Sequence, residues 1–182
     1  MSIRSVTFAC LFVALVGCSG SASPEKPASA AKNDSVSRQK FSDFEFGVPD
    51  GWTRENVGGG LLLMAPDIEN NWQANLFLEI RDDPEGRTLE LALADLATNL
   101  EARKEQFHEV SRKIVKHSGG FNMGILEYTW VEQGSALTEL EIIIEAGSTK
   151  RFFVLASSAS ASWAKYQPMF QRFIESLKKT AA

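Results

Sequence analysis

The sequence predicts an α+β domain in which helices flank a central antiparallel β-sheet. Short apolar stretches with strand period recur along the chain, clusters of Gly, Pro, Asn, Asp and Ser separate them, and two stretches have helical period. Such turn residues favour hairpins between consecutive strands. The expected order is two or three strands, a helix, four antiparallel strands and a second helix.

The first strands are expected between residues 44 and 81. Phe44–Val48 alternates apolar with small or polar residues, and Pro49-Asp50-Gly51 ends it as a turn. Gly58-Gly59-Gly60 predicts a hairpin turn and not a phosphate-binding loop, because it lacks the Lys-Ser/Thr pair and the helix of such loops. Buried strands are then expected at 61–65 and 72–81.

The first helix is expected after Thr88, which suits an N-cap. Apolar residues follow it at helical spacing: Leu89, Leu93, Leu96, Leu100 and Phe107. Strands are expected at 110–116, at 121–131 and around 139–145, and 151–158 is apolar on both faces, as in a central strand. The second helix is expected to become regular near Gln167, because Pro168 suits a first turn.

Three acidic residues form a row in the strand around 139–145. Glu139, Glu141 and Glu145 alternate with Leu140, Ile142 and Ile144, so we expect the apolar residues to point inward and the row to face solvent. The alternative is that the row binds a divalent cation or guides a basic partner. Trp72 and Trp52 are the candidate recognition aromatics, and for both the favoured interpretation is that they cover the ends of the core.

The N-terminus has the features of a bacterial lipoprotein signal. Arg4 precedes an uncharged stretch that is too short to span a bilayer, and this stretch ends in Leu15-Val16-Gly17-Cys18. The tetrapeptide resembles the lipobox, whose cysteine is diacylated and becomes the new N-terminus. Residues 1–17 are therefore expected to be a signal peptide and Cys18 a lipid anchor. Because Ser19 follows, the resemblance favours the outer membrane, facing the periplasm, in a Gram-negative host.

Residues 18–40 are expected to be the lipidated N-terminus and a disordered tether. They are rich in Ser, Ala, Pro and charged residues and lack the apolar content needed to pack. The folded domain is expected to span 41–180.

The residues offer little for catalysis or for binding metal. Both cysteines, Cys10 and Cys18, precede the domain, which excludes from it a Cys nucleophile, a Cys metal site and a disulfide. His108 and His117 are nine positions apart, so one continuous strand would place them on opposite faces, and we interpret both as surface residues. No serine lies in a G-x-S-x-G motif. We therefore expect no catalytic residue, metal or cofactor.

A family resemblance adds to this picture. Phe44-Glu45-Phe46-Gly47-Val48-Pro49-Asp50-Gly51-Trp52 and the ending Phe170–Leu177 resemble the opening and closing motifs of PsbP-like and DcrB-like proteins. These include bacterial lipoproteins, the extrinsic PsbP subunit of photosystem II and a Ran-binding nuclear import factor. The resemblance implies a PsbP-like α/β/α sandwich, protein binding or assembly as the role, and no catalytic residues.

The function expected from the sequence is that of an envelope lipoprotein, anchored to the membrane by lipid, that binds an unidentified protein without catalysis. The net charge of −4 argues against nucleic acid as a partner. Two alternatives stay open. One is a carrier of a small ligand or lipid, and the other is an envelope hydrolase that uses carboxylates.

We predict that Cys18 carries the anchor. Mass spectrometry of the N-terminal peptide of the protein from membranes should show an acylated cysteine, because the lipobox is complete and a polar tether follows it. An unmodified Cys18, or a mature chain that starts elsewhere, would contradict the prediction.

Overall fold

A computed structural model of the chain describes residues 37–147 and 149–180. The expected signal peptide, Cys18 and most of the expected tether lie outside these residues. The strands are β1 (Ser37–Phe41), β2 (Phe44–Val48), β3 (Thr53–Val57), β4 (Gly60–Glu69), β5 (Trp72–Asp82), β6 (Glu105–Lys116), β7 (Asn122–Glu132), β8 (Ser135–Glu145), β9 (Lys150–Ala159) and β10 (Lys178–Lys179). The helices are α1 (Leu89–Glu101), the short 3₁₀ helix Ser160–Ser162 and α2 (Trp163–Ser176).

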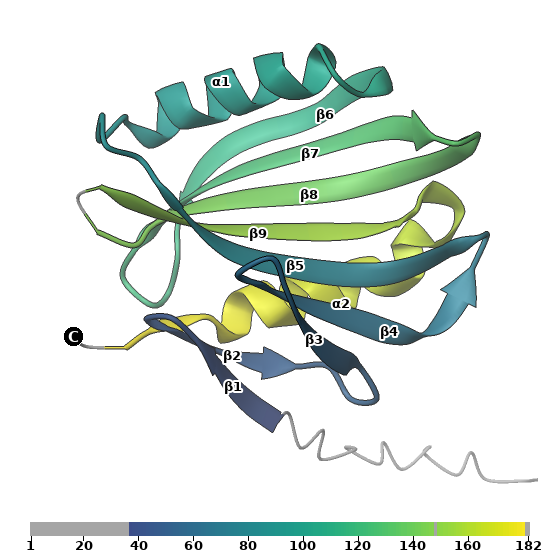
Figure 1. Cartoon of the computed structure of the whole chain (residues 1–182), viewed down its shortest axis with the longest axis horizontal. Coiled ribbons are helices and arrows are strands. Elements are labelled where there is room, and N and C mark those ends of the chain that lie inside the picture. The colour runs from purple at the N-terminus through teal and green to yellow at the C-terminus, as the bar shows by residue number, and fades with distance from the viewer. Residues whose placement is uncertain (1–36, 148, 181–182) are drawn as a thin grey trace, which may run out of the picture. The chain divides into compact units, whose positions relative to one another are not determined.

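A seven-stranded antiparallel sheet dominates the domain (Figure 1), with the strand order β3-β4-β5-β9-β8-β7-β6. A smaller sheet has the order β1-β2-β10. The hairpins predicted from the turn residues are present: Val57 pairs with Gly60, and Gly58 and Gly59 both have positive φ angles, as a tight two-residue turn requires. The four consecutive antiparallel strands after α1 are confirmed.

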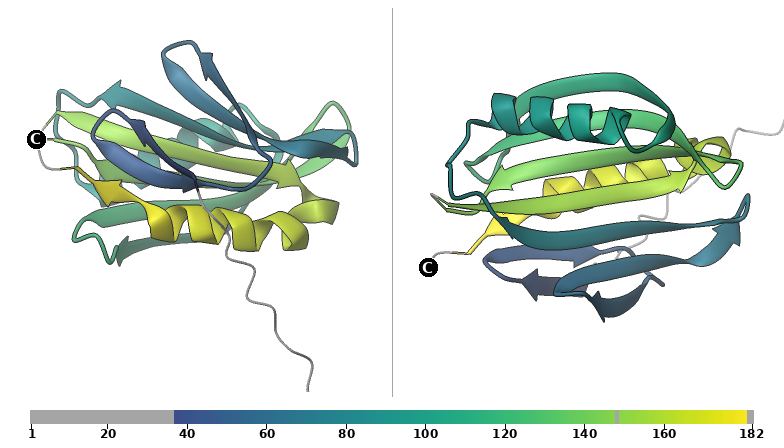
Figure 2. Two further views of the ribbon diagram at one scale, coloured as in Figure 1. Left: turned by 90° about the horizontal axis from the view of Figure 1, so that it is seen from below. Right: turned by 45° about the horizontal axis from the view of Figure 1, so that its top comes forward.

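One face of the large sheet is covered by α2 and the small sheet, as Figure 2 shows from two sides. The alternate residues Leu76, Leu78 and Val154 of this face pack against Phe44 and Phe46 of β2 and against α2. Aromatic side chains make up much of this core, and the ring of Phe44 stacks on that of Phe152 with the two ring centroids 4.3 Å apart. This is the main hydrophobic core of the domain.

The opposite face is covered only in part, by α1. This helix packs on β6, β7 and β8, where Leu93 and Leu100 meet Leu126 and Ile143. It approaches β7 closely, because a Cβ on Gly124 would lie 2.9 Å from Leu93 Cδ1. The same face of β9, β5 and β4 has no helix over it (Figure 1). The domain is therefore dominated by its sheet, and the expected sandwich with helices over both faces is only partly present.

Two helix boundaries differ from the sequence-based expectation. α1 starts after Thr88, whose Oγ1 accepts a hydrogen bond from Leu91 N, but it ends at Glu101 and does not extend to Phe107. Phe107 lies in β6 and packs against the apolar cluster of α1, so its helical spacing reflects a shared core and not a shared helix. α2 starts at Trp163, so Pro168 lies inside the helix and not in its first turn. Pro168 cannot donate a hydrogen bond to the carbonyl of Ala164. The helix tolerates this because both residues are exposed and the free carbonyl can reach water.

The N-terminal boundary also lies earlier than expected. β1 begins at Ser37 instead of near Phe41, and Ser37 and Arg38 pair with Val48 and Gly47. The polar residues at positions 37–40 are ordered by backbone pairing with β2 and not by burial of apolar side chains. Their composition therefore indicated a tether.

We predict that a chain starting at Ser42 melts at a lower temperature than one starting at Ser37. The shorter chain loses the β1–β2 pairing and the contact of Phe41 with Phe152, whose ring centroids lie 6.3 Å apart. Circular dichroism melts of the two chains test this. Equal melting temperatures would show that β1 contributes nothing to stability.

Candidate functional site

The expected acidic row is divided by the fold, and this corrects the prediction of a solvated row. Glu139 and Glu141 are 3% and 6% exposed, whereas the side chain of Glu145 is 49% exposed and lies 3.7 Å from Arg151. Residues 139 and 141 do alternate with core residues, but they point to the face that α1 partly covers. Both faces of β8 are buried in its middle, so alternation did not distinguish solvent from a second buried face.

Glu139 is surrounded by donors. Lys104 Nζ lies 3.0 Å from its Oε2, Tyr128 Oη donates to the same oxygen at 2.5 Å, and Ser157 Oγ donates to Oε1 at 3.1 Å. Lys104 lies in the turn after α1, and its Nζ is also 3.3 Å from the centroid of the Trp130 ring. The buried carboxylate is thus fully paired, which is what stabilises a charge in an apolar setting.

Glu141 has no comparable donor. Among the described residues, its one side-chain hydrogen-bond contact is with Tyr128 Oη at 3.5 Å. A hydroxyl carries one proton, and the shorter contact shows that Tyr128 donates it to Glu139. Burial, together with a smaller effect of the charge of Glu139, raises the pKa of Glu141 to about 7 against the opposing charge of Arg81. Burial, followed by the charges of the two glutamates, also raises the pKa of Tyr128, so this residue stays a neutral donor.

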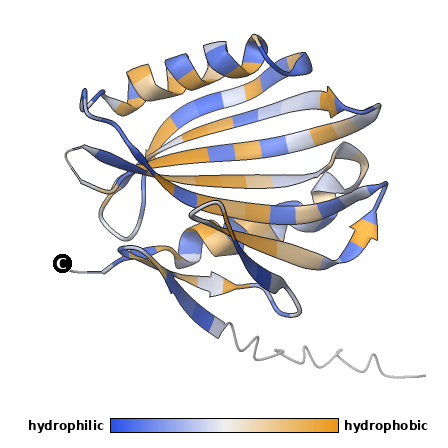
Figure 3. Cartoon of the chain, in the orientation of Figure 1, coloured by the Kyte–Doolittle hydropathy of each residue, from blue (hydrophilic) through white to orange (hydrophobic). Residues whose placement is uncertain are grey.

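Beside these glutamates lies an apolar surface on β4, β5 and β9. It consists of Leu62, Met64, Phe77, Phe153 and Leu155, and we call it the open face. These partly buried residues lie on the same side of the sheet as α1. All except Phe153 lie outside both buried apolar clusters of the described chain. Apolar residues follow one another along β9 and the first half of β4, so both faces of these strands are apolar (Figure 3).

The register places the open face and Glu141 in one row across the sheet. Leu62 pairs with Phe77, Phe77 with Leu155, and Leu155 with Glu141. The Phe77 ring lies over Gly60, where an added Cβ would be 2.5 Å from Cζ. The absence of a side chain at Gly60 therefore makes room for this ring. An apolar row thus ends at a buried carboxyl without a donor.

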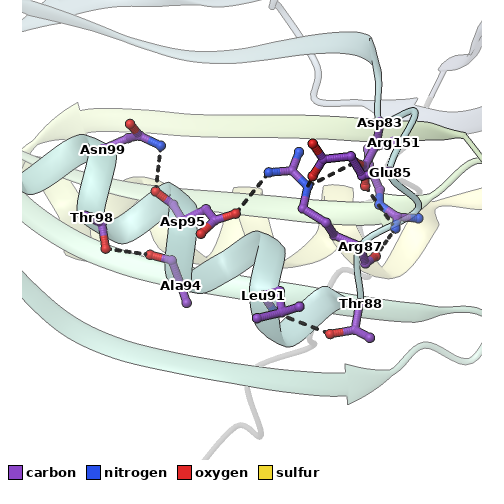
Figure 4. A network of polar contacts seen from close by, with 10 residues as sticks. All are labelled: Asp83, Glu85, Arg87, Thr88, Leu91, Ala94, Asp95, Thr98, Asn99 and Arg151. Atoms are coloured by element: carbon purple, nitrogen blue, oxygen red, sulfur yellow. Dashed lines mark hydrogen bonds and ion pairs between the residues drawn. The ribbon is translucent and has the colours of Figure 1, made fainter.

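A second polar cluster lies between α1 and strands β5 and β9 (Figure 4). Arg87 bonds Asp83 and Asp95, and Arg151 forms an ion pair with Asp83 and donates to the carbonyl of Arg87. The hydrogen bond to Asp83, followed by that to Asp95, raises the pKa of Arg87. These contacts join the loop before α1 to β9 and border a hollow of about 180 Å³. The cluster fixes the position of α1.

The other candidate residues are not brought together with the acidic pair. Trp72 is half-buried at the start of β5, and strand alternation places it with Ala74 on the α2 face, opposite Glu139 and Glu141. Its indole N–H has no acceptor among the described residues. Trp52 packs edge-on against Tyr166 and Phe170 of α2, as expected of a residue that covers the core.

The histidines are separate, and one is not at the surface. His108 is exposed on β6, whereas His117 is 8% exposed and stacks on Phe121. His117 Nδ1 accepts from Gly119 N at 2.8 Å, and Nε2 lies 3.0 Å from the carbonyl oxygen of Ile174. His117 therefore joins the β6–β7 turn to the end of α2. Within the described residues, no group of three or more His, Cys, Asp and Glu could hold a metal ion.

Comparisons with solved structures identify the fold. The cyanobacterial PsbP protein CyanoP from Synechocystis superposes with a TM-score of 0.60 at 18% identity, covering 86% of this chain and 99% of that one. LpqN of Mycobacterium tuberculosis, described as involved in cell envelope biogenesis, gives 0.62 at 12% identity, covering 82% and 88%. PA94 from Pseudomonas aeruginosa gives 0.58 at 15% identity, covering 81% and 99%.

The domain has a PsbP-like fold. No model of a known protein family matches the sequence, and no curated protein matches it. The PsbP-like part of the resemblance drawn from the N-terminal and C-terminal motifs is thus confirmed at the level of the fold, and the DcrB-like part stays a prediction. In the described part of the PsbP-like domain, no helix has the length and apolar character to cross a membrane.

We predict that Glu141→Gln stabilises the PsbP-like domain more at pH 7.5 than at pH 5. Between the ordinary carboxyl pKa of 4.5 and about 7, folded Glu141 keeps a proton that the unfolded chain has released, so the wild-type free energy of unfolding falls as pH rises. The full effect is about 3 kcal/mol, and Gln removes it. Urea unfolding of both proteins at the two pH values measures the difference. A stability gain that does not change with pH would contradict the role assigned to Glu141.

Proposed function

We propose that this chain is a non-catalytic binding module of the cell envelope that is held at the membrane through lipid on Cys18 and binds a partner protein with the open face. The observation that carries the proposal is the apolar row Leu62–Phe77–Leu155, which no helix of the described chain covers. The side chains of this row are only partly buried, and apolar patches that stay partly open to solvent on soluble domains mark interaction surfaces.

The envelope location is supported from two directions. The lipobox ending in Cys18 predicts export and anchoring, and Ser19 favours the outer membrane, facing the periplasm, in a Gram-negative host. One of the similar structures, LpqN, is described as involved in cell envelope biogenesis. A lipid anchor confines the domain near the membrane and raises its local concentration, which favours weak protein contacts.

The geometry favours a binder over the two alternatives. A carrier needs an enclosed cavity of at least about 300 Å³. The hollow between α2 and the Pro49 turn measures about 240 Å³, and the hollows of about 340 and 370 Å³ beside Phe121 and beside Ile114 are open surface depressions. A hydrolase needs a carboxylate free to exchange protons with a substrate in a cleft. Glu139 is fully bonded within the domain, and neither it nor Glu141 lines the hollow between α1 and strands β5 and β9.

We predict that a photo-crosslinking amino acid at position 77 or 155 of the full chain yields a protein adduct in living cells. Both positions lie on the open face, so a bound partner would be within reach. The matched control is position 91, because Leu91 is 56% exposed but lies on α1 away from the sheet. Gel shifts after irradiation give the measurement. The proposal would be overturned if no adduct formed at positions 77 and 155, or if the adduct yield at position 91 equalled the yield at these two positions.

A further inference from the structure

We propose that the open face receives an amphipathic helix of the partner protein, laid beside α1, with a Lys or Arg of that helix bonded to Glu141. This inference rests on the proposed function and specifies the chemistry of the partner. It follows from the width of the uncovered surface, from the carboxyl of Glu141 at its border, which has only the long contact with Tyr128 among the described residues, and from the charges around it.

The width suits one helix. α1 occupies the part of this face formed by β6, β7 and β8, and β9, β5 and β4 remain uncovered (Figure 1). Three neighbouring strands span about 14 Å, and a helix with its side chains is about 10 Å across. A second helix alongside α1 would therefore complete the layer, burying Leu62, Phe77 and Leu155 as α1 buries Leu126 and Ile143.

The border of the surface favours a cation in the partner. Glu141 is 6% exposed and next to Leu155, and the single proton of Tyr128 is donated to Glu139. The nearby cations are already engaged: Lys104 with Glu139, and Arg81 with Glu79 and the Phe153 ring. A buried carboxylate gains most from a partner that arrives with its own charge and displaces water.

Other occupants fit these residues less well. Glu55 and Glu79 flank the apolar row, which disfavours an anionic lipid surface. Addition of a strand would need a long, regular free edge. The edge strand β3 has only five residues, and β6 at the other edge has shifted register at two places and carries many charged residues, among them Arg112 and Lys116. A helix that lies on the face requires neither an edge nor a cavity.

The test combines a photo-crosslinker at position 77 of the full chain with Glu141→Gln, in cells. Glu145→Gln is the matched control, because Glu145 lies on the same strand but is half-exposed and near Arg151. Adduct yield should fall at least about tenfold with Glu141→Gln, since loss of one member of a buried charge pair speeds dissociation. It should stay within about twofold with Glu145→Gln, as is typical of exposed charges. Glu141→Met, apolar and of similar size, should reproduce the loss if both variants keep the wild-type melting temperature or exceed it.

The crosslinked partner peptide, sequenced by mass spectrometry, should carry apolar residues at helical spacing and a Lys or Arg. An undiminished adduct in Glu141→Gln and Glu141→Met would overturn this inference and leave the proposed binding function standing. A crosslinked lipid, or a peptide without a basic residue, would overturn it as well. No adduct at position 77 in the wild-type background would overturn both.

Discussion

Both faces of the central sheet are apolar over β9 and the first half of β4, and Phe77 connects the second apolar face across β5. A sheet with two apolar faces needs cover on each side. The main core meets this need on one face, where α2 and the small sheet close over Phe152 and Val154. On the other face the described chain supplies only α1, which packs over β6, β7 and β8. The remaining surface is continuous with the cluster beneath α1 through Phe153. This uneven cover gives the domain its candidate binding surface.

The position of α1 also decides the chemistry of the glutamates. The ion pairs of Arg87 and Arg151 with Asp83 fix the start of the helix, and the turn that contains Lys104 follows its end. Lys104 is thereby brought to Glu139, which becomes a fully paired carboxylate. Glu141, two residues further along β8, has the same burial without the donors. Two glutamates on one strand therefore differ in their surroundings, and burial raises the pKa of the one without close donors, Glu141, to about 7.

Much of the fold could be predicted from local patterns. The Gly58-Gly59-Gly60 turn, the Thr88 cap and the four consecutive antiparallel strands after α1 depend on interactions between near neighbours in the chain. Prediction was wrong where distant residues decided the outcome. β1 is ordered by pairing with β2, and Phe107 joins the α1 cluster from a strand, and neither effect leaves a local signature. The apolar runs Leu61–Ala65 and Phe152–Ala156 did indicate that both faces of β4 and β9 avoid water.

The sequence by itself determined the two helices and the four strands between them, the apolar residues of the main core and the N-terminal features that predict a lipid anchor. Each depends on composition or periodicity, which a linear chain displays directly. The sequence did not determine the number of strands before α1, which is five and not two or three. Only the tertiary structure decided that Glu139 and Glu141 are buried, that Glu145 is separate from them, and that Trp72 lies on the opposite face. Alternation assigns a residue to a face of its strand, but whether that face meets water or a helix depends on where α1 packs, which contacts across the whole chain determine.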